Sequence, residues 1–595
     1  MMQDKNAPLL PHLSEAEKLE IGSLVFAGLP LPPQYKERLF PSVPAAGVFT
    51  DSEKAGIRAG CPEAEASIRC GGSSGFACCS ETDFQVCEYF PRQNADAAER
   101  HGDVCTFIPD AGNGRINTGF SSEEWSNLLI HGDNRDVLRA VADGALRDAV
   151  SRAGGIKLIY ADPPFAVGSD FMIELAVGDT AGKAAQRLST VAFTDSWGAG
   201  ADSFAAMLFA RIQLMHAVLA EDGSIYLHCD RRAAPLARLF MDHIFGPERM
   251  LGEIIWHYTG GGRAKRYFSR KHDVILHYAK SGDWTFNLDA VRVPYKESSG
   301  YARGGIVSAA GKHYRPHPKG TPVDDVWSIP IVNPMGHERL SYPTQKPEAL
   351  LTRIIEASSK PGDLVADFFC GSGTTLAVAG RLDRKWIGAD KGVFAIHEAR
   401  KRLLSLGASP VQENEIQAGH FAVLECVAGQ AKGAQAGGAI ILDGTQTSLP
   451  GFTLKAGLVP VGNEPSLVHG FFVELTDCAF PKGGLAPQLC SLAESWPEWI
   501  DYWSVDYDYL PGFFQSRWQS FRTRRDRGLV LQSPVFSFPE GARCKGASFR
   551  AAILAVDVFS RAHLLELDTA ALLPFLSRKP DRAAPLPPLP RIDGD

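Results

Sequence analysis

The chain has 595 residues, which suggests two to four domains and supplies enough apolar sequence for a sizeable core. Its 61 Lys and Arg residues stand against 68 Asp and Glu residues, and the resulting net charge of −7 does not indicate a nucleic-acid partner. The sequence shows neither an apolar run of about 18 residues nor a secretory signal, so we expect no membrane association and a cytoplasmic location with reduced cysteines.

Residues 1–120 form a cysteine-rich N-terminal extension with poorly defined structure. It holds six of the twelve cysteines, namely Cys61, Cys70, Cys78, Cys79, Cys87 and Cys105. Tetrahedral zinc sites are usually built from CxxC pairs, but none occurs here and His101 is the only histidine nearby. We therefore predict no metal, and expect reduced structural thiols or partial disorder, with a zinc site as the alternative.

Residues 121–249 contain two apolar segments that end in acids. NLLIHGDN, Asn127 to Asn134, predicts a strand followed by a helix, and Asp133 is placed to cap that helix. KLIYADPPF, Lys157 to Phe165, predicts a strand with Asp162 at its carboxyl end, where open α/β sheets bind ligands. Pro163 and Pro164 lack N–H groups, so they offer carbonyl acceptors on a stiff backbone.

The rest of this part predicts a mobile loop over Gly168 to Arg187, followed by alternating helices and a strand. We expect helices over Phe204 to Leu219 and Asp230 to Phe245, and a strand over Ser224 to His228. His228 and Cys229 near that strand end are interpreted as structural residues.

Residues 250–330 differ in charge from the rest of the chain. Between Leu251 and Gly320, twelve Lys and Arg residues stand against five Asp and Glu residues, so the remainder of the chain carries −14. The run GGGRAKRYFSRKHD combines glycines and aromatic rings with Arg263, Lys265, Arg266, Arg270 and Lys271. This pattern is typical of a surface that contacts nucleic-acid phosphates, although a solvated charged face has the same composition.

Residues 331–412 predict half of a nucleotide-binding sheet. After YPTQKP come a strand over Leu364 to Phe369, two glycines, a helix over Thr374 to Leu382 and a strand over Trp386 to Ala389. Asp390 ends that second strand 19 residues after Gly371, a spacing that suits an acid accepting hydrogen bonds from ribose hydroxyls. Leu376 stands where a dinucleotide fingerprint has its third glycine, which argues against an NAD-linked oxidoreductase.

Residues 413–577 predict a β-rich C-terminal domain, and 578–595 a proline-rich disordered tail. Five arginines in the domain could extend a DNA-binding surface or lie in a solvated loop, namely Arg517, Arg522, Arg524, Arg525 and Arg527. Three acids that could be read as nuclease ligands, Asp501, Asp506 and Asp508, lack an accompanying lysine motif.

Three motifs together carry a resemblance to a known family. DPPF, YPTQKP and FCGSG, in this order, resemble the permuted β group of S-adenosylmethionine-dependent DNA amino-methyltransferases, which includes type III modification subunits. The resemblance covers roughly Asn127 to Leu404. It implies an α/β fold, a Rossmann-like doubly wound methyltransferase sheet in circularly permuted order, with an inserted target-recognition region and the β-rich C-terminal domain.

The resemblance also implies roles for the motif residues. Asp162 and the Pro163 carbonyl would accept the hydrogens of the target amine, Pro164 would stiffen the turn, and Phe165 would stack on a flipped base. The family more often has tyrosine in place of Phe165 and proline in place of Phe368. Residues expected to bind the cofactor are Asp133, Thr344, Lys346, Asp367, Phe369, Gly371, Gly373, Thr374 and Asp390.

Within this set, Asp133 would lie beside the adenine of S-adenosylmethionine, and Thr344 and Lys346 would contact its carboxylate. The expected substrate is double-stranded DNA, and aspartate at the first position of DPPF is typical of adenine N6 methylation in this family. Cytosine N4 methylation and a non-catalytic DNA-binding relative remain alternatives. The chain has no GxxxxGK[ST], so ATP-driven translocation or cleavage would need a separate restriction or helicase subunit; homodimerisation is left open.

Overall fold

The computed structural model describes most of the chain from residue 83 onward. The described residues are 83–90, 125–177, 186–195, 201–259, 263–296, 299–307, 311–407, 421–427, 439–442, 445–448, 453–462, 468–479, 493, 495–511, 513–537, 550–567 and 592–593. The cysteine-rich extension therefore lies outside them except for the segment that holds Cys87, as does the predicted disordered tail except for its residues 592–593.

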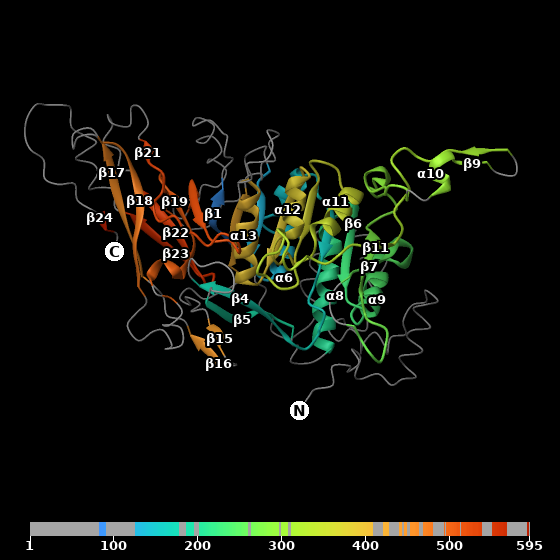
Figure 1. Ribbon diagram of the computed structural model, residues 1–595, viewed down its shortest axis with the longest axis horizontal. Coiled ribbons are helices and arrows are strands. Elements are labelled where there is room, and N and C mark those ends of the chain that lie inside the picture. Colours follow the sequence, from blue (N-terminus) through green and yellow to red (C-terminus); the bar gives the residue numbers. More distant parts are fainter. Residues whose placement is uncertain are drawn as a thin grey trace, which may run out of the picture.

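A mixed sheet organises the described part of the chain (Figure 1). Its order is β1-β14-β2-β13-β12-β3-β6-β8-β7-β11, and the strands from β14 to β6 are all parallel. The strands are β1 (Asp83–Phe90), β2 (Asn127–His131), β3 (Ile156–Ala161), β6 (Leu219–Cys229), β7 (Met250–His257), β8 (His272–Ala279), β11 (Val326–Ser328), β12 (Leu364–Asp367), β13 (Lys385–Asp390) and β14 (Phe421–Val427). The predicted strands that precede DPPF, the glycine loop and Asp390 are thus confirmed.

Helices cover both faces of this sheet. The helices are α6 (Asn134–Ala142), α7 (Arg147–Arg152), α8 (Ala201–Val218), α9 (Ala234–Phe245), α11 (Glu348–Ser358), α12 (Thr374–Arg381) and α13 (Val393–Gly407). Leu128 and Ile130 of β2 point into one core, which α6, α8 and α9 share, whereas Leu129 points into the other core with α11, α12 and α13. Successive side chains along the strand therefore contribute to the cores on opposite faces of the sheet, and the predicted doubly wound α/β sheet is confirmed.

The sheet is wider than the predicted domain limits. β1 comes from the predicted N-terminal extension, β14 from the predicted C-terminal domain, and β7, β8 and β11 from the predicted target-recognition region. β7 and β8 carry apolar side chains such as Ile254 and Ile275, which belong to the second core. The basic composition belongs mainly to the segments between these strands, including the loop 258–271 and the stretch with α10 (Gly300–Gly304), β9 (Ile306–Val307) and β10 (His313–Tyr314).

A hairpin replaces much of the expected mobile loop. β4 (Asp170–Val177) and β5 (Gln186–Thr194) pair antiparallel, so the expectation of a segment without strands was wrong. Ile173, Leu175 and Val177 alternate along β4 and are buried, because they pack in a cluster with Trp499, Val558 and Phe559 of the C-terminal region. Figure 1 shows the hairpin reaching from the central sheet toward those strands.

The C-terminal strands form two four-stranded sheets around one core, which confirms the β-rich C-terminal region. Their strands are β17 (Thr453–Gly462), β18 (Val468–Ala479), β19 (Ile500–Asp506), β20 (Trp518–Phe521), β21 (Phe536–Ser537), β22 (Ala551–Asp557), β23 (Ala562–Leu567) and β24 (Ile592–Asp593). β24, which lies in the tail that was predicted to be disordered, pairs antiparallel with β17. A separate pair joins β15 (Ala439–Leu442) to β16 (Thr445–Ser448). No helix in the described ranges combines the length and the hydropathy that crossing a bilayer requires.

Candidate functional site at the carboxyl ends of the central strands

The DPPF turn and the segment before α11 meet in space. β3 and β12 are parallel neighbours, so the residues that follow them emerge at the same edge of the sheet. Lys346 donates a hydrogen bond to Oδ2 of Asp162. The other oxygen, Oδ1, is buried and has no hydrogen-bond partner among the described residues. A buried acceptor of this kind is costly unless a ligand supplies a donor.

Phe165 lies between a cation and a histidine. Lys346 Nζ is 5.7 Å from the centre of its ring, and the His228 ring stacks on it at 6.0 Å and 27°. His228 is fully buried, with Nδ1 2.8 Å from the Tyr160 hydroxyl and Nε2 3.4 Å from Asp273 Oδ2. Both ring nitrogens therefore have protein partners, which supports the interpretation of His228 as structural.

A buried acid fixes the loop that follows Phe165. Ala166 has a positive φ of 54°, and the N–H groups of Ala166 and Val167 each donate to Asp195 at 2.9 Å. Asp195 follows β5, so the hairpin holds the DPPF turn in place. Sequence reasoning missed Asp195, because nothing near it in the sequence marks its partners 28 and 29 residues earlier.

The glycine loop has the conformation that glycine permits. Gly371 and Gly373 have φ values of 49° and 71°, and a Cβ on Gly373 would lie 2.9 Å from that of Ala399. Asp390 receives the Gly371 N–H at 2.9 Å on one oxygen and the Gly392 N–H at 2.8 Å on the other. Burial raises the pKa of Asp390 above its ordinary value. Because each carboxylate oxygen has two lone pairs, Asp390 retains acceptor capacity for a ligand.

Asp367 lies under the glycine loop. Its side chain is almost fully buried, and it accepts hydrogen bonds from the Phe369 N–H at 3.0 Å and the Thr375 hydroxyl at 2.5 Å. Burial raises its pKa to about 7, and the charges of Asp162 and Asp390 add to this effect. Asp367 therefore fixes the conformation of the glycine loop through hydrogen bonds to residues on both sides of it, whereas Phe369 is partly exposed.

Thr374 joins the glycine loop to the segment of Lys346. Its hydroxyl donates to the Lys346 carbonyl at 3.3 Å and accepts from Arg402 at 2.8 Å. Gln345, which sequence reasoning missed, is buried and bridges the Leu340 N–H and the Glu338 carbonyl. Its place inside YPTQKP was the available signal, since an amide offers both a donor and an acceptor.

Thr344, in contrast, is exposed, with a positive φ of 60°. The structure gives it no contact with Lys346, so its expected place beside that side chain rests on the sequence motif alone.

The missing third glycine has a packing explanation. Leu376 of α12 lies against β13, where a Cβ on Gly388 would be only 2.3 Å from Leu376 Cδ1. The glycine that allows close contact between helix and strand is therefore on the strand, opposite the leucine.

Asp133 caps α6, as one of its two readings predicted. It accepts from the Arg135 N–H at 2.9 Å, and Arg211 donates to the same oxygen at 2.8 Å. Partial burial opposes ionisation of Asp133, but the Arg135 N–H and the Arg211 guanidinium outweigh it and hold its pKa below the usual value. Asp133 precedes α6, and the N–H of neighbouring Gly132 donates to the Asp390 carbonyl, so both acids lie at the same sheet edge.

The predicted phosphate-binding residues lie on the loop that joins β7 to β8. Tyr258 N–H donates to the Lys271 carbonyl at 2.9 Å and closes the base of this loop. Arg270 lies 4.9 Å from the centre of the Tyr267 ring, and Phe268 is 99% exposed. The loop residues with no acidic partner in the described part of the chain are Arg263, Lys265, Arg266 and Arg270. None of the loop cations contacts Asp162, so the structure does not join these two groups.

Metal chemistry finds no support among the described residues, where no group of three or more His, Cys, Asp or Glu side chains is arranged to hold an ion. Asp501 pairs with Lys401, and Asp506 accepts the backbone N–H groups of Asp508 and Gln515. Asp501 and Asp506 are therefore engaged in contacts within the chain, which lend no support to a nuclease interpretation.

Comparison with known proteins places the site in a family context. A family model described as DNA methylase, for N6 and N4 methyltransferases, matches residues 156–401. The DNA adenine methyltransferase YhdJ of Escherichia coli K12 is 32% identical over 288 residues, which cover 48% of this chain and 85% of YhdJ. The type II methyltransferase M1.MboII of Moraxella bovis is 36% identical over 194 residues, which cover 30% of this chain and 72% of M1.MboII. The crystal structure of an M1.HpyAVI–SAM complex is 20% identical and covers 46% of this chain and 98% of that one, with a TM-score of 0.30.

Proposed function

Because the chain belongs to the DNA methylase family of N6 and N4 methyltransferases, we propose that it transfers a methyl group from S-adenosylmethionine to N6 of an adenine flipped out of duplex DNA. The observation that carries this proposal is the junction of Asp162, Lys346 and the glycine loop at one sheet edge. Membership confirms the predicted class of enzyme, and the roles of individual residues are part of the proposal.

The residues at this edge fit S-adenosylmethionine. Asp390 retains acceptor capacity for ribose hydroxyls, and Gly371 and Gly373 add no side chains that would block a nucleoside. Lys346 offers an ammonium for the cofactor carboxylate, and Asp133 lies at the same edge for the adenine ring. When bound, the cofactor supplies an electrophilic methyl group.

The chain itself would position and stabilise the target amine. The amine nitrogen becomes positively charged as it attacks, and Asp162 Oδ1 is a buried acceptor with no partner among the described residues. The Pro163 carbonyl would accept the second hydrogen. Phe165, held by His228, would stack on the extruded base, a contribution of roughly 1–3 kcal/mol. The loop 258–271 would hold the DNA backbone through Arg263, Lys265, Arg266, Arg270 and Lys271.

We propose adenine and not cytosine as the target base, because aspartate at the first position of DPPF is typical of adenine N6 methylation in this family. Cytosine N4 methylation would use the same groups. Any cleavage or translocation coupled to methylation would need a separate restriction or helicase subunit, since the chain contains no phosphate-binding GxxxxGK[ST] loop.

Mapping modified bases tests the proposal. The wild-type chain or its Asp162→Ala variant is expressed in cells that lack other DNA methyltransferases. DNA from these cells is then sequenced to detect N6-methyladenine and N4-methylcytosine. We expect N6-methyladenine in one sequence context for the wild-type chain and none for the variant. N4-methylcytosine would move the proposal to cytosine, and no modified base in either sample would overturn it.

A further inference from the structure

Four of the five C-terminal arginines separate into a buried and an exposed pair, and Arg517 is half-buried. Arg522 is fully buried and donates to the Ile500 and Pro497 carbonyls at 2.9 and 3.0 Å. Arg527 is also buried, whereas Arg524 and Arg525 between them are exposed. The loop 523–528 therefore has an inner side that is fixed and an outer side that carries two cations.

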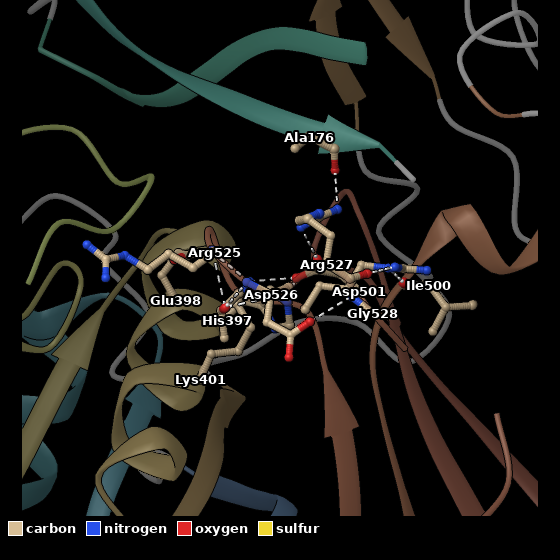
Figure 2. Close-up of polar contacts among 12 residues, drawn as sticks. Ala176, His397, Glu398, Lys401, Ile500, Asp501, Arg525, Asp526, Arg527 and Gly528 are labelled. Atoms are coloured by element: carbon tan, nitrogen blue, oxygen red, sulfur yellow. Dashed lines mark hydrogen bonds and ion pairs between the residues drawn. The ribbon is translucent and has the colours of Figure 1, made fainter. Parts of the chain in front are cut away.

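The inner side is attached to two other parts of the molecule (Figure 2). Asp501 accepts from Lys401 at 2.6 Å and lies 2.9 Å from His397 Nε2, so β19 is joined to α13. Arg527 contacts the same carboxylate at 3.4 Å and donates to the Ala176 carbonyl of β4 at 2.7 Å. Burial opposes ionisation of Asp501, but Lys401 and His397 outweigh it and hold its pKa far below the usual range. The loop is thereby fixed in orientation relative to the site.

The outer side lies beside the segment that leads to Lys346. The Arg525 guanidinium contacts the His337 ring and is 3.4 Å from the Met335 carbonyl. Partial burial lowers the pKa of Arg339, and the nearby positive charge of Arg524 lowers it further. We call His337, Arg339, Arg524 and Arg525 the arginine cluster.

No carboxylate in the described part of the chain forms an ion pair with the arginine cluster. The two nearest acids in sequence hydrogen-bond to the backbone instead of to these guanidinium groups, since Asp526 accepts the Gly528 N–H at 3.0 Å and Glu338 accepts the Glu348 N–H at 2.5 Å. The positive charges of Arg339, Arg524 and Arg525 repel one another, and an anion would relieve the repulsion. Guanidinium groups match phosphate oxygens in geometry, so a phosphodiester is the anion that fits.

We propose that the arginine cluster is a second phosphate-binding surface for duplex DNA, formed jointly by the C-terminal domain and the segment before Lys346. This inference rests on the proposed function. It gives the C-terminal region a role, because its loop 523–528 carries two of the cations, and Asp501 and Arg527 fix this region to α13 and β4. DNA held by the loop 258–271 would then have a second contact, on the YPTQKP side of the site.

Salt-dependent DNA binding tests the arginine cluster. Fluorescence anisotropy with a labelled duplex gives Kd against salt for the wild-type chain, Arg524→Ala/Arg525→Ala and Arg524→Lys/Arg525→Lys. The matched control is Lys455→Ala/Arg550→Ala, which removes two exposed cations of the C-terminal sheets that already have carboxylate partners. The slope of log K against log salt is negative, and each phosphate contact contributes about −0.9 to it. The double alanine variant should therefore show a slope that is less steep by up to about 1.8.

The lysine variant should recover most of the slope, and the control should match wild type. The inference is overturned if the double alanine variant keeps the wild-type slope and affinity, or if the slope of the control falls by as much as that of the double alanine variant. Failure of the proposed function would look different, because the wild-type chain itself would then fail to methylate DNA.

Discussion

Lys346 donates a hydrogen bond to Asp162 and so joins two motifs that are 184 residues apart in the sequence. Both side chains are mostly buried, at 12% and 17% exposure. The family resemblance predicted that Lys346 would pair with the carboxylate of the cofactor. Since an ammonium has three N–H donors, it can serve Asp162 and the cofactor together.

Lys346→Met should therefore impair both binding and chemistry. Loss of a charged hydrogen bond costs about 1.5–3 kcal/mol, so we expect roughly a 10- to 150-fold rise in the cofactor Kd. We also expect a fall in kcat at saturating cofactor, because Asp162 loses its partner. Thr344→Val, at an exposed position, is the control for kcat: it should change cofactor affinity but leave kcat at saturating cofactor unchanged. If kcat of Lys346→Met stays at the wild-type value, Lys346 does not support Asp162.

Asp390→Asn should weaken cofactor binding with little effect on the rate at saturation. The substitution keeps one acceptor but sets an amide group against a backbone N–H of Gly371 or Gly392, and the charge offered to the ribose is lost. A cost of roughly 1.5–3 kcal/mol in cofactor affinity follows. Titration calorimetry measures it, with the exposed, distant Asp383→Asn as the control. Unchanged affinity would contradict the ribose role.

Phe165→Tyr and Phe165→Trp should remain active, because each keeps an aromatic face against His228. Phe165→Ala should lose stacking of roughly 1–3 kcal/mol on the extruded base. A duplex with 2-aminopurine at the target position reports extrusion by fluorescence, which the aromatic variants quench. Equal fluorescence and equal rate for wild type and Phe165→Ala would show that Phe165 does not stack on the base.

Asp367 should make stability depend on pH. Its folded-state pKa is raised to about 7 by burial, whereas an unfolded aspartate titrates near about 3.9. Between these values the folded state binds more protons than the unfolded state, so the free energy of unfolding falls as pH rises from about 4 to about 7. Above that window the contribution is constant. Urea unfolding of wild type and Asp367→Asn at pH 5 and pH 8 checks this.

We expect the loss of stability between these two pH values to be smaller in Asp367→Asn than in wild type. Asparagine retains an acceptor for the Phe369 N–H, so the loop contact itself is kept. An equal loss in both proteins would mean that Asp367 is ionised at pH 5 or does not titrate in this range.

The local sequence was sufficient to predict the position of a motif where one segment contains both a strand and the polar residue that follows it. Ile156–Ala161 is an apolar run that ends next to Asp162, and Leu364–Asp367 runs directly into the glycine loop, so both motifs were placed correctly at strand ends. The cap at Asp133 was predictable for the same reason, since its partner is only two residues away.

Partners far apart in sequence could not be predicted. Glu88 of β1 is fully buried because Tyr502 and Ser504, more than 400 residues away, donate to it. Without those partners, the segment looked like part of an unstructured extension. β7 and β8 were assigned to a target-recognition region because the basic loop between them dominates the composition of 250–330. The pairing of β8 with β6 is a long-range contact that composition does not indicate.

The most direct test of the proposed chemistry is single-turnover methyl transfer by Asp162→Ala at saturating cofactor and DNA. Hydrogen bonds to the developing charge act in the transition state, so we expect the transfer rate to fall by about 100-fold or more while the Kd for S-adenosylmethionine stays within about threefold of wild type. A transfer rate within about threefold of wild type would contradict the assignment of Asp162 as the acceptor for the target amine.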